Sequence, residues 1–218
     1  MVADLVVGRV SKERGPMARY TGPKCRKCRR YGVSLCGKVK CALIKRQQPP
    51  GPRSLRRRKI SDRGQQLIEK QKVRFAYGLM ERQFRDYYDR AVRRPGVTGE
   101  LLMRSLEERL DNVVFRLGFA STRAQARQLV THGLVAVNGQ KLDVPSAHIK
   151  VGAAIGLTDR GKRSEYAKIL REEIKSRDCP GWLELDRDAL SGRVAGEPGA
   201  GDIEAHFNPN AIVEYYSR

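Results

Sequence analysis

The sequence predicts an α+β protein, a mostly helical domain that begins with a basic cysteine knuckle and carries an inserted small helix–helix–β-hairpin subdomain. Three observations lead to this prediction. Apolar residues recur at helical spacing across most of residues 61–132. Residues 134–144 alternate between apolar and polar around Asn138-Gly139, and Asn-Gly is the strongest short-range hairpin signal. Four cysteines lie at residues 25–41, within a segment, 17–60, that is too rich in Gly, Pro and Arg to build a large core.

The chain is expected to contain five segments. Residues 1–16 show no clear pattern, and they precede the run "MARYTGPKC" that starts at Met17. The cysteine-rich segment is expected to need a metal ion or RNA to become ordered. We expect a disordered extension at 1–16, a basic cysteine-rich segment at 17–60, a helical domain at 61–104, a helix–helix–hairpin module at 105–157, and a C-terminal segment at 158–218 that packs back on the helical domain.

The helical domain is expected to begin at Asp62, which can cap a helix with Gln65 at the capping-box position. This first helix should stop at Gly78. A second helix is expected over residues 80–94, because Phe84, Tyr87, Tyr88 and Ala91 form one stripe that is better explained as core than as a stacking surface for bases.

A third, long helix is expected at 100–118, closed by Gly118, and the inserted module begins within it. Thr122 should cap a short helix, with Gln125 three residues later and Gly133 at its end.

After the hairpin, the alternation of residues predicts more strands than helices. We expect a strand within 148–157, a helix at about 162–177, a possible strand at 181–186 and a terminal strand at 211–216.

The charge predicts a polyanionic partner. The chain has 44 Lys and Arg against 24 Asp and Glu, a net charge of +20, which is costly in a compact state unless a polyanion neutralises it. Residues 14–61 hold 16 of these bases and no acid, whereas residues 178–218 carry a net −5 (3 basic and 8 acidic). Nucleic acid is the first candidate and an anionic membrane surface the second. No apolar run approaches the roughly 20 residues of a membrane span, so a cytoplasmic location is expected.

The cysteines are spaced Cys25-x2-Cys28-x7-Cys36-x4-Cys41, which indicates a structural zinc knuckle, since zinc in closed sites prefers four thiolates. Nearby bases would lower the pKa of the thiols and offset the charge of a tetrathiolate. The alternatives are free, reduced cysteines in a basic tail and, less strongly, an iron–sulfur cluster. The remaining Cys179 stands alone.

Basic and polar side chains on several segments are predicted to contact RNA, because guanidinium groups bind phosphates in pairs of hydrogen bonds. Arg123 and Arg127 are four residues apart and share a helix face. Asn138 is equally explained as a turn residue, His132 as a helix-end residue, and Arg116 as a partner of nearby acids. The full set is Lys24, Arg26, Lys27, Arg29, Arg30, Arg53, Arg56, Arg57, Arg58, Lys59, Lys72, Arg74, Arg82, Arg104, Arg116, Arg123, Arg127, Gln128, His132, Asn138 and Lys141.

Catalytic patterns are missing from the sequence. It has three histidines and no phosphate-binding glycine loop, no Gly-x-Ser-x-Gly elbow and no metal-binding histidine pair. We therefore predict no enzymatic activity and no small-molecule substrate.

Residues 105–146, "SLEERLDNVVFRLGFASTRAQARQLVTHGLVAVNGQKLDVPS", closely resemble the RNA-binding module first defined in small ribosomal subunit protein four. The module also occurs in some RNA-modifying enzymes and tRNA synthetases. Outside it, "MARYTGPKCRKCRR" (17–30), "EKQKVRFAYGLMERQF" (69–84), "PGWLELD" (180–186) and "EYYSR" (214–218) are similar to the same ribosomal family.

The resemblance implies a bacterial or organellar member of that family. Such proteins bind the five-prime domain of small-subunit rRNA, nucleate subunit assembly, lie beside ribosomal protein five and the channel by which mRNA enters, and influence translational accuracy. Zinc-binding members carry four N-terminal cysteines, matched here by those at 25, 28, 36 and 41. Two alternatives remain, an RNA-modifying enzyme and an RNA-binding translational repressor or RNA chaperone that works outside the ribosome.

Overall fold

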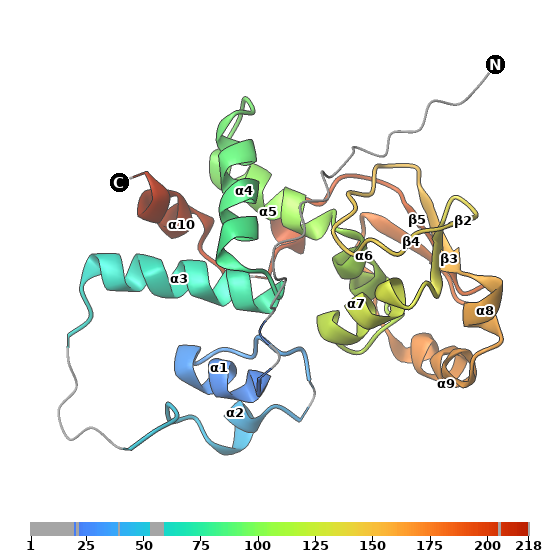
Figure 1. Ribbon diagram of the computed structural model, residues 1–218, viewed down its shortest axis with the longest axis horizontal. Coiled ribbons are helices and arrows are strands. Elements are labelled where there is room, and N and C mark those ends of the chain that lie inside the picture. The colour runs from blue at the N-terminus through green and yellow to red at the C-terminus, as the bar shows by residue number, and fades with distance from the viewer. Residues whose placement is uncertain (1–19, 21, 39, 53–58, 205, 218) are drawn as a thin grey trace.

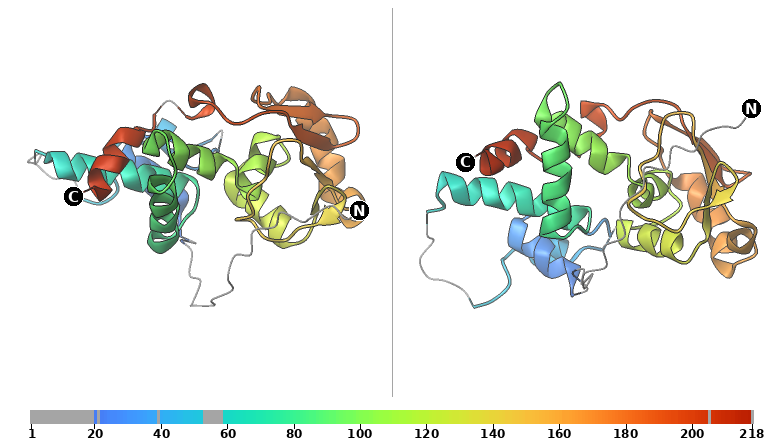
Figure 2. Two further views of the ribbon diagram at one scale, coloured as in Figure 1. Left: turned by 90° about the horizontal axis from the view of Figure 1, so that it is seen from above. Right: turned by 45° about the horizontal axis from the view of Figure 1, so that its top comes forward.

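The computed structural model describes residues 20, 22–38, 40–52, 59–204 and 206–217. Two units lie side by side along the long axis of the molecule (Figure 1), and they remain side by side in the views of Figure 2. One unit is all-helical and the other combines helices with a small sheet. The expected extension at 1–16 lies outside the described residues.

The helical unit has one hydrophobic core, built by helices from both ends of the chain. Phe84, Leu102 and Ile212, from three different helices, are fully buried in it. Ser61, rather than the expected Asp62, caps the third helix by accepting a hydrogen bond from the Gly64 N–H. The helices of this unit are α1 (Lys24–Tyr31), α2 (Ala42–Lys45), α3 (Asp62–Ala76), α4 (Glu81–Val92), α5 (Thr98–Glu107) and α10 (Pro209–Tyr216).

The helix expected over residues 100–118 is two helices, α5 and α6 (Leu110–Arg116). Between them Glu108 O accepts a hydrogen bond from the Ile149 N–H, and Arg109 forms an antiparallel bridge with His148. Backbone groups of residues 108 and 109 therefore pair with the loop that follows the hairpin, and this pairing interrupts the helix. The break lies where the chain passes from the first unit to the second.

The second unit is an antiparallel sheet covered by helices, and its strands run in the order β2-β1-β3-β5-β4. Asn138 (φ 50°) and Gly139 (φ 79°) form the predicted two-residue turn between β1 and β2. The elements after α6 are α7 (Arg123–Thr131), β1 (Val135–Val137), β2 (Gln140–Lys141), β3 (Ala154–Leu157), α8 (Asp159–Lys162), α9 (Glu165–Glu173), η1 (Ile174–Ser176), β4 (Leu183–Asp186), β5 (Ser191–Val194) and η2 (Ala200–Asp202).

The C-terminal segment divides between the two units. Strand β5 pairs with β3 and extends the sheet of the second unit, while α10 lies against α3 and α5 of the helical unit (Figures 1 and 2). The predicted terminal strand at 211–216 is wrong. Asn208 caps a helix there and Pro209 starts it, and helical geometry lets both Ile212 and Tyr216 face the core. No described helix has the length and hydropathy needed to span a bilayer.

Candidate nucleic-acid interface

The N-terminal cysteines gather in one place, on α1 and on the segment that joins α1 to α2. The Sγ atoms of Cys25, Cys36 and Cys41 all lie within 4.8 Å of one another. Cys28 is completely buried and contacts the thiols of Cys36 and Cys41. A tetrahedral site with metal–sulfur bonds of about 2.3 Å needs sulfurs about 3.8 Å apart, so the cluster can hold a metal ion after small shifts of its side chains.

The thiols of this cluster titrate differently. Burial raises the pKa of Cys28 to about 12. Burial also acts on Cys41, but hydrogen bonds from the Leu43 backbone, from Ser34 and from the neighbouring thiols outweigh it and lower the pKa of Cys41. Since metal ligands must be thiolates, metal binding here would release protons and depend on pH.

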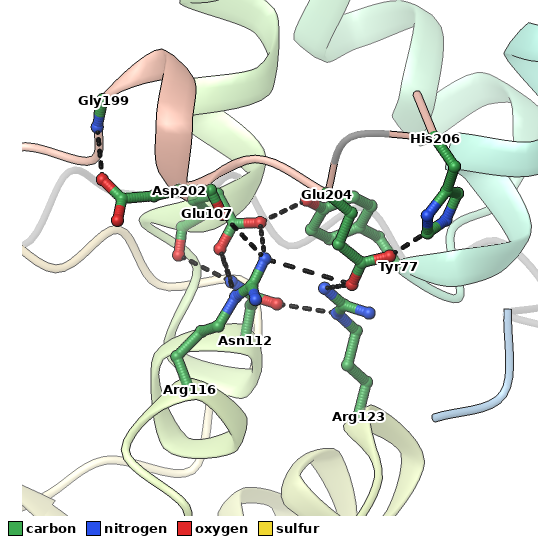
Figure 3. A network of polar contacts seen from close by, with 9 residues as sticks. All are labelled: Tyr77, Glu107, Asn112, Arg116, Arg123, Gly199, Asp202, Glu204 and His206. Atoms are coloured by element: carbon green, nitrogen blue, oxygen red, sulfur yellow. Dashed lines mark hydrogen bonds and ion pairs between the residues drawn. The ribbon is translucent and has the colours of Figure 1, made fainter. Parts of the chain in front are cut away.

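A buried carboxylate, Glu107, forms the centre of the contact between the two units (Figure 3). Its side chain is completely buried, and it accepts hydrogen bonds from Tyr77, from Asn112 Nδ2 at 2.6 Å and from Arg116 Nε and Nη2 at 2.9 and 2.8 Å. Burial would raise the pKa of this carboxyl, but the hydrogen bonds and charge of Arg116 outweigh burial and lower it.

Arg123 extends this network to the C-terminal segment. Its guanidinium donates to Asn112 Oδ1 at 2.8 Å and to Glu204 Oε1 at 2.6 Å (Figure 3). It also lies over the rings of Tyr77 and Phe115, 4.7 and 4.8 Å from their centroids. Arg123 therefore holds the helical unit, the α6–α7 module and the segment before α10 together.

A second buried acid, Asp111, pairs with two further arginines. Arg109, 2% exposed, donates to both carboxylate oxygens at 3.0 and 2.8 Å and to the Tyr87 hydroxyl at 2.8 Å. Arg127 Nη1 lies 3.1 Å from the same carboxylate. Thus three arginines predicted to bind RNA, Arg116, Arg123 and Arg127, make intramolecular ion pairs, as proposed for Arg116 in the alternative interpretation.

The other described residues of the predicted set fall into three groups: residues with intramolecular polar partners, half-buried lysines and exposed residues. Arg29 donates to backbone carbonyls at 48 and 49, Lys72, Arg74 and Arg104 pair with carboxylates, and the Asn138 amide accepts from the Ala154 N–H. Lys24 and Lys27 are half-buried on α1, and Lys27 lies over the rings of Tyr20 and Phe75. The exposed group comprises Arg26, Arg30, Lys59, Arg82, Gln128, His132 and Lys141. Arg53, Arg56, Arg57 and Arg58 lie outside the described residues.

Several exposed bases were not selected from the sequence. Arg90 lies in the last turn of α4, and Arg93 and Arg94 follow that helix directly. All three belong to the run "RAVRRPG", which could have indicated them. A further set covers α8, α9 and η1, and consists of Arg160, Lys162, Arg163, Arg171 and Lys175. Exposed basic surface thus occurs on both units.

Two family models match the chain: "Ribosomal protein S4/S9 N-terminal domain" over residues 19–107, and "S4 domain" over residues 108–155. The boundary between them coincides with the break between α5 and α6. Small ribosomal subunit protein uS4 of Dehalococcoides mccartyi is 53% identical over 207 residues. The proteins of that name from Desulforamulus reducens and Herpetosiphon aurantiacus are 47% and 49% identical. Each alignment covers 93% of this chain and all of the relative. The model that matches residues 19–107 and these relatives carry the names of ribosomal proteins, and none of the names describes an enzyme.

Proposed function

Because this chain belongs to the ribosomal protein S4 family of small-subunit structural components, we propose that it is a primary binder of small-subunit rRNA. Within the subunit it binds the five-prime domain and nucleates assembly. The observation that carries this proposal is the set of exposed, basic side chains on both units of a chain with a net charge of +20. Without a polyanion, such a charge repels itself at considerable cost.

We infer different roles for the arginines in buried ion pairs and for the exposed basic residues. The buried pairs around Glu107 and Asp111 hold the two units in one orientation. The exposed basic residues, such as Arg30 on α1 and Lys141 on β2, then contact RNA from two units whose relative orientation is fixed. Phosphate contacts supply most of the affinity, and the fit of the fixed surface to folded RNA supplies the specificity.

The cysteine cluster is proposed to hold one structural zinc ion through Cys25, Cys28, Cys36 and Cys41. Four thiolates fill the coordination sphere, so the ion would order the N-terminal segment and leave no position for a reacting ligand. Metal analysis of native protein purified without chelators should give about one zinc per chain. A ratio near zero would refute zinc binding without affecting the RNA proposal.

Further features of the family are proposed for this chain by membership alone. They are a location beside ribosomal protein five, proximity to the path of incoming mRNA, and a contribution to translational accuracy.

Sedimentation of cell extract tests the ribosomal location. A tagged full-length chain should migrate with the small subunit and stay there after a moderate salt wash. Recovery of most of the chain in the ribosome-free fractions would favour the alternative of a translational repressor or RNA chaperone that works outside the ribosome.

A further inference from the structure

A small cavity lies where the two units meet, away from the arginine network around Glu107. Its volume is about 90 Å³. Helix α4 and the residues just after it supply one side, α5 supplies another, and the loop before β3 supplies a third. The lining residues are Tyr87, Arg90, Ala91, Arg94, Leu101, Ser105 and His148.

The lining is positively charged. Arg90, in the last turn of α4, and Arg94, just after the helix, are both exposed. Among the described residues, the ion pairs include neither of these guanidinium groups. No acid is among the lining residues. Two carboxylates pair with residues next to the cavity: Glu108 lies 3.6 Å from Nδ1 of His148, and Asp111 pairs with Arg109, the donor to Tyr87. By contrast, a larger cavity of about 270 Å³ near α10 is lined by Glu100 and Glu204, and these carboxylates would repel an anion.

Tyr87 is one of the residues that line this cavity. It is 7% exposed, with the Arg90 guanidinium 5.8 Å from its ring centroid and the His148 ring 5.7 Å away. Its hydroxyl accepts a hydrogen bond from the buried Arg109 at 2.8 Å. A tyrosine hydroxyl that accepts in this way still has its own hydrogen to donate, and the neighbouring cation strengthens that donor.

We propose that this cavity takes one phosphate group of the RNA backbone. The guanidinium groups of Arg90 and Arg94 bind its oxygens, and the Tyr87 hydroxyl is the third donor. His148 comes from the second unit, so the phosphate sits across the junction and is recognised only while the two units keep their orientation. This inference rests on the proposed function, since it names one contact of the same RNA.

The test compares two double variants of the full-length protein. R90Q/R94Q removes the cavity cations, and R85Q/R93Q removes two exposed arginines of the same α4 segment that do not line the cavity. Binding to the five-prime domain of small-subunit rRNA is measured at several salt concentrations. The slope of log K against log salt should become shallower by about 0.7–0.9 for R90Q/R94Q, the range for one lost phosphate contact on single-stranded or duplex nucleic acid, and by less for the control.

Ethylation of single RNA phosphates locates the contact. Ethylation of one particular phosphate should block RNA binding by the wild-type protein and by the R85Q/R93Q control. The same ethylation should not weaken the binding of R90Q/R94Q any further. If every blocking position acts equally on all three proteins, or if both double variants change the slope alike, the cavity is not a phosphate site. Failure of the wild-type protein to bind this RNA at all would instead overturn the proposed function, and the inference with it.

Discussion

Replacing Glu107 with Gln should destabilise the protein more than any other single isosteric change in the network between the units. Oε1 of Glu107 accepts from Tyr77 and Arg116, and Oε2 accepts from Asn112 and Arg116. Either orientation of a Gln amide therefore points its NH2 group at two donors. The change also leaves Arg116, whose side chain is 17% exposed, without its main counter-charge.

Breaking one partner of a buried ion pair costs about 3–5 kcal/mol. At about 2–4 °C per kcal/mol for a chain of this size, the midpoint of thermal unfolding should fall by about 6–20 °C. The assay is thermal unfolding followed by circular dichroism, checked against a denaturant titration. The matched control is Glu165→Gln, because Glu165 pairs with Lys168 on the surface of α9 and its side chain is 84% exposed. Equal midpoints for the two variants would refute the assignment of Glu107 as the centre of the interface.

Three further experiments test separate parts of the account. The lowered pKa of Glu107 contributes stability above its ordinary value of 4.5, and this stability is lost as pH falls through the lower value in the folded state. Acid unfolding of E107Q should therefore depend less steeply on pH below about 4.5 than that of the wild type. Gly192→Ala would place a Cβ 2.4 Å from a methyl of Leu117 and should cost about 1–3 kcal/mol in denaturant titrations, whereas Gly181→Ala, with nothing within 4 Å, should cost little. Thr122→Ala removes the cap of α7 and should cost about 1 kcal/mol by the same method.

Local patterns predicted the local elements well. Thr122 caps α7 through the Gln125 N–H, and Asn138-Gly139 forms the hairpin turn, because each signal depends only on residues a few positions apart. The break at Arg109 could not be read in this way. It arises because the loop around His148, some forty positions away, takes the hydrogen bonds of the segment. The terminal strand failed for a related reason: "AIVEYY" has the composition of a strand, but the preceding Asn208 and Pro209 start a helix.

The candidate site shows the same division between local and long-range information. The cysteine spacing was sufficient to predict a cluster, since all four residues lie close in the sequence. The charge of an arginine does not predict whether its side chain is exposed to solvent or forms an ion pair with a buried carboxylate. Arg123 shares a helix with the exposed Gln128, yet its partner Glu204 lies in the C-terminal segment, 81 residues away. Only the fold brings such partners together.

The central claim is specific binding to small-subunit rRNA, and a titration of the full-length protein against the folded five-prime domain tests it most directly. The titration is repeated at several salt concentrations and in the presence of excess transfer RNA. The account predicts tight binding that survives the competitor and weakens steeply as salt rises. Equal affinity for both RNAs would contradict it, because the positive charge alone would then account for the binding.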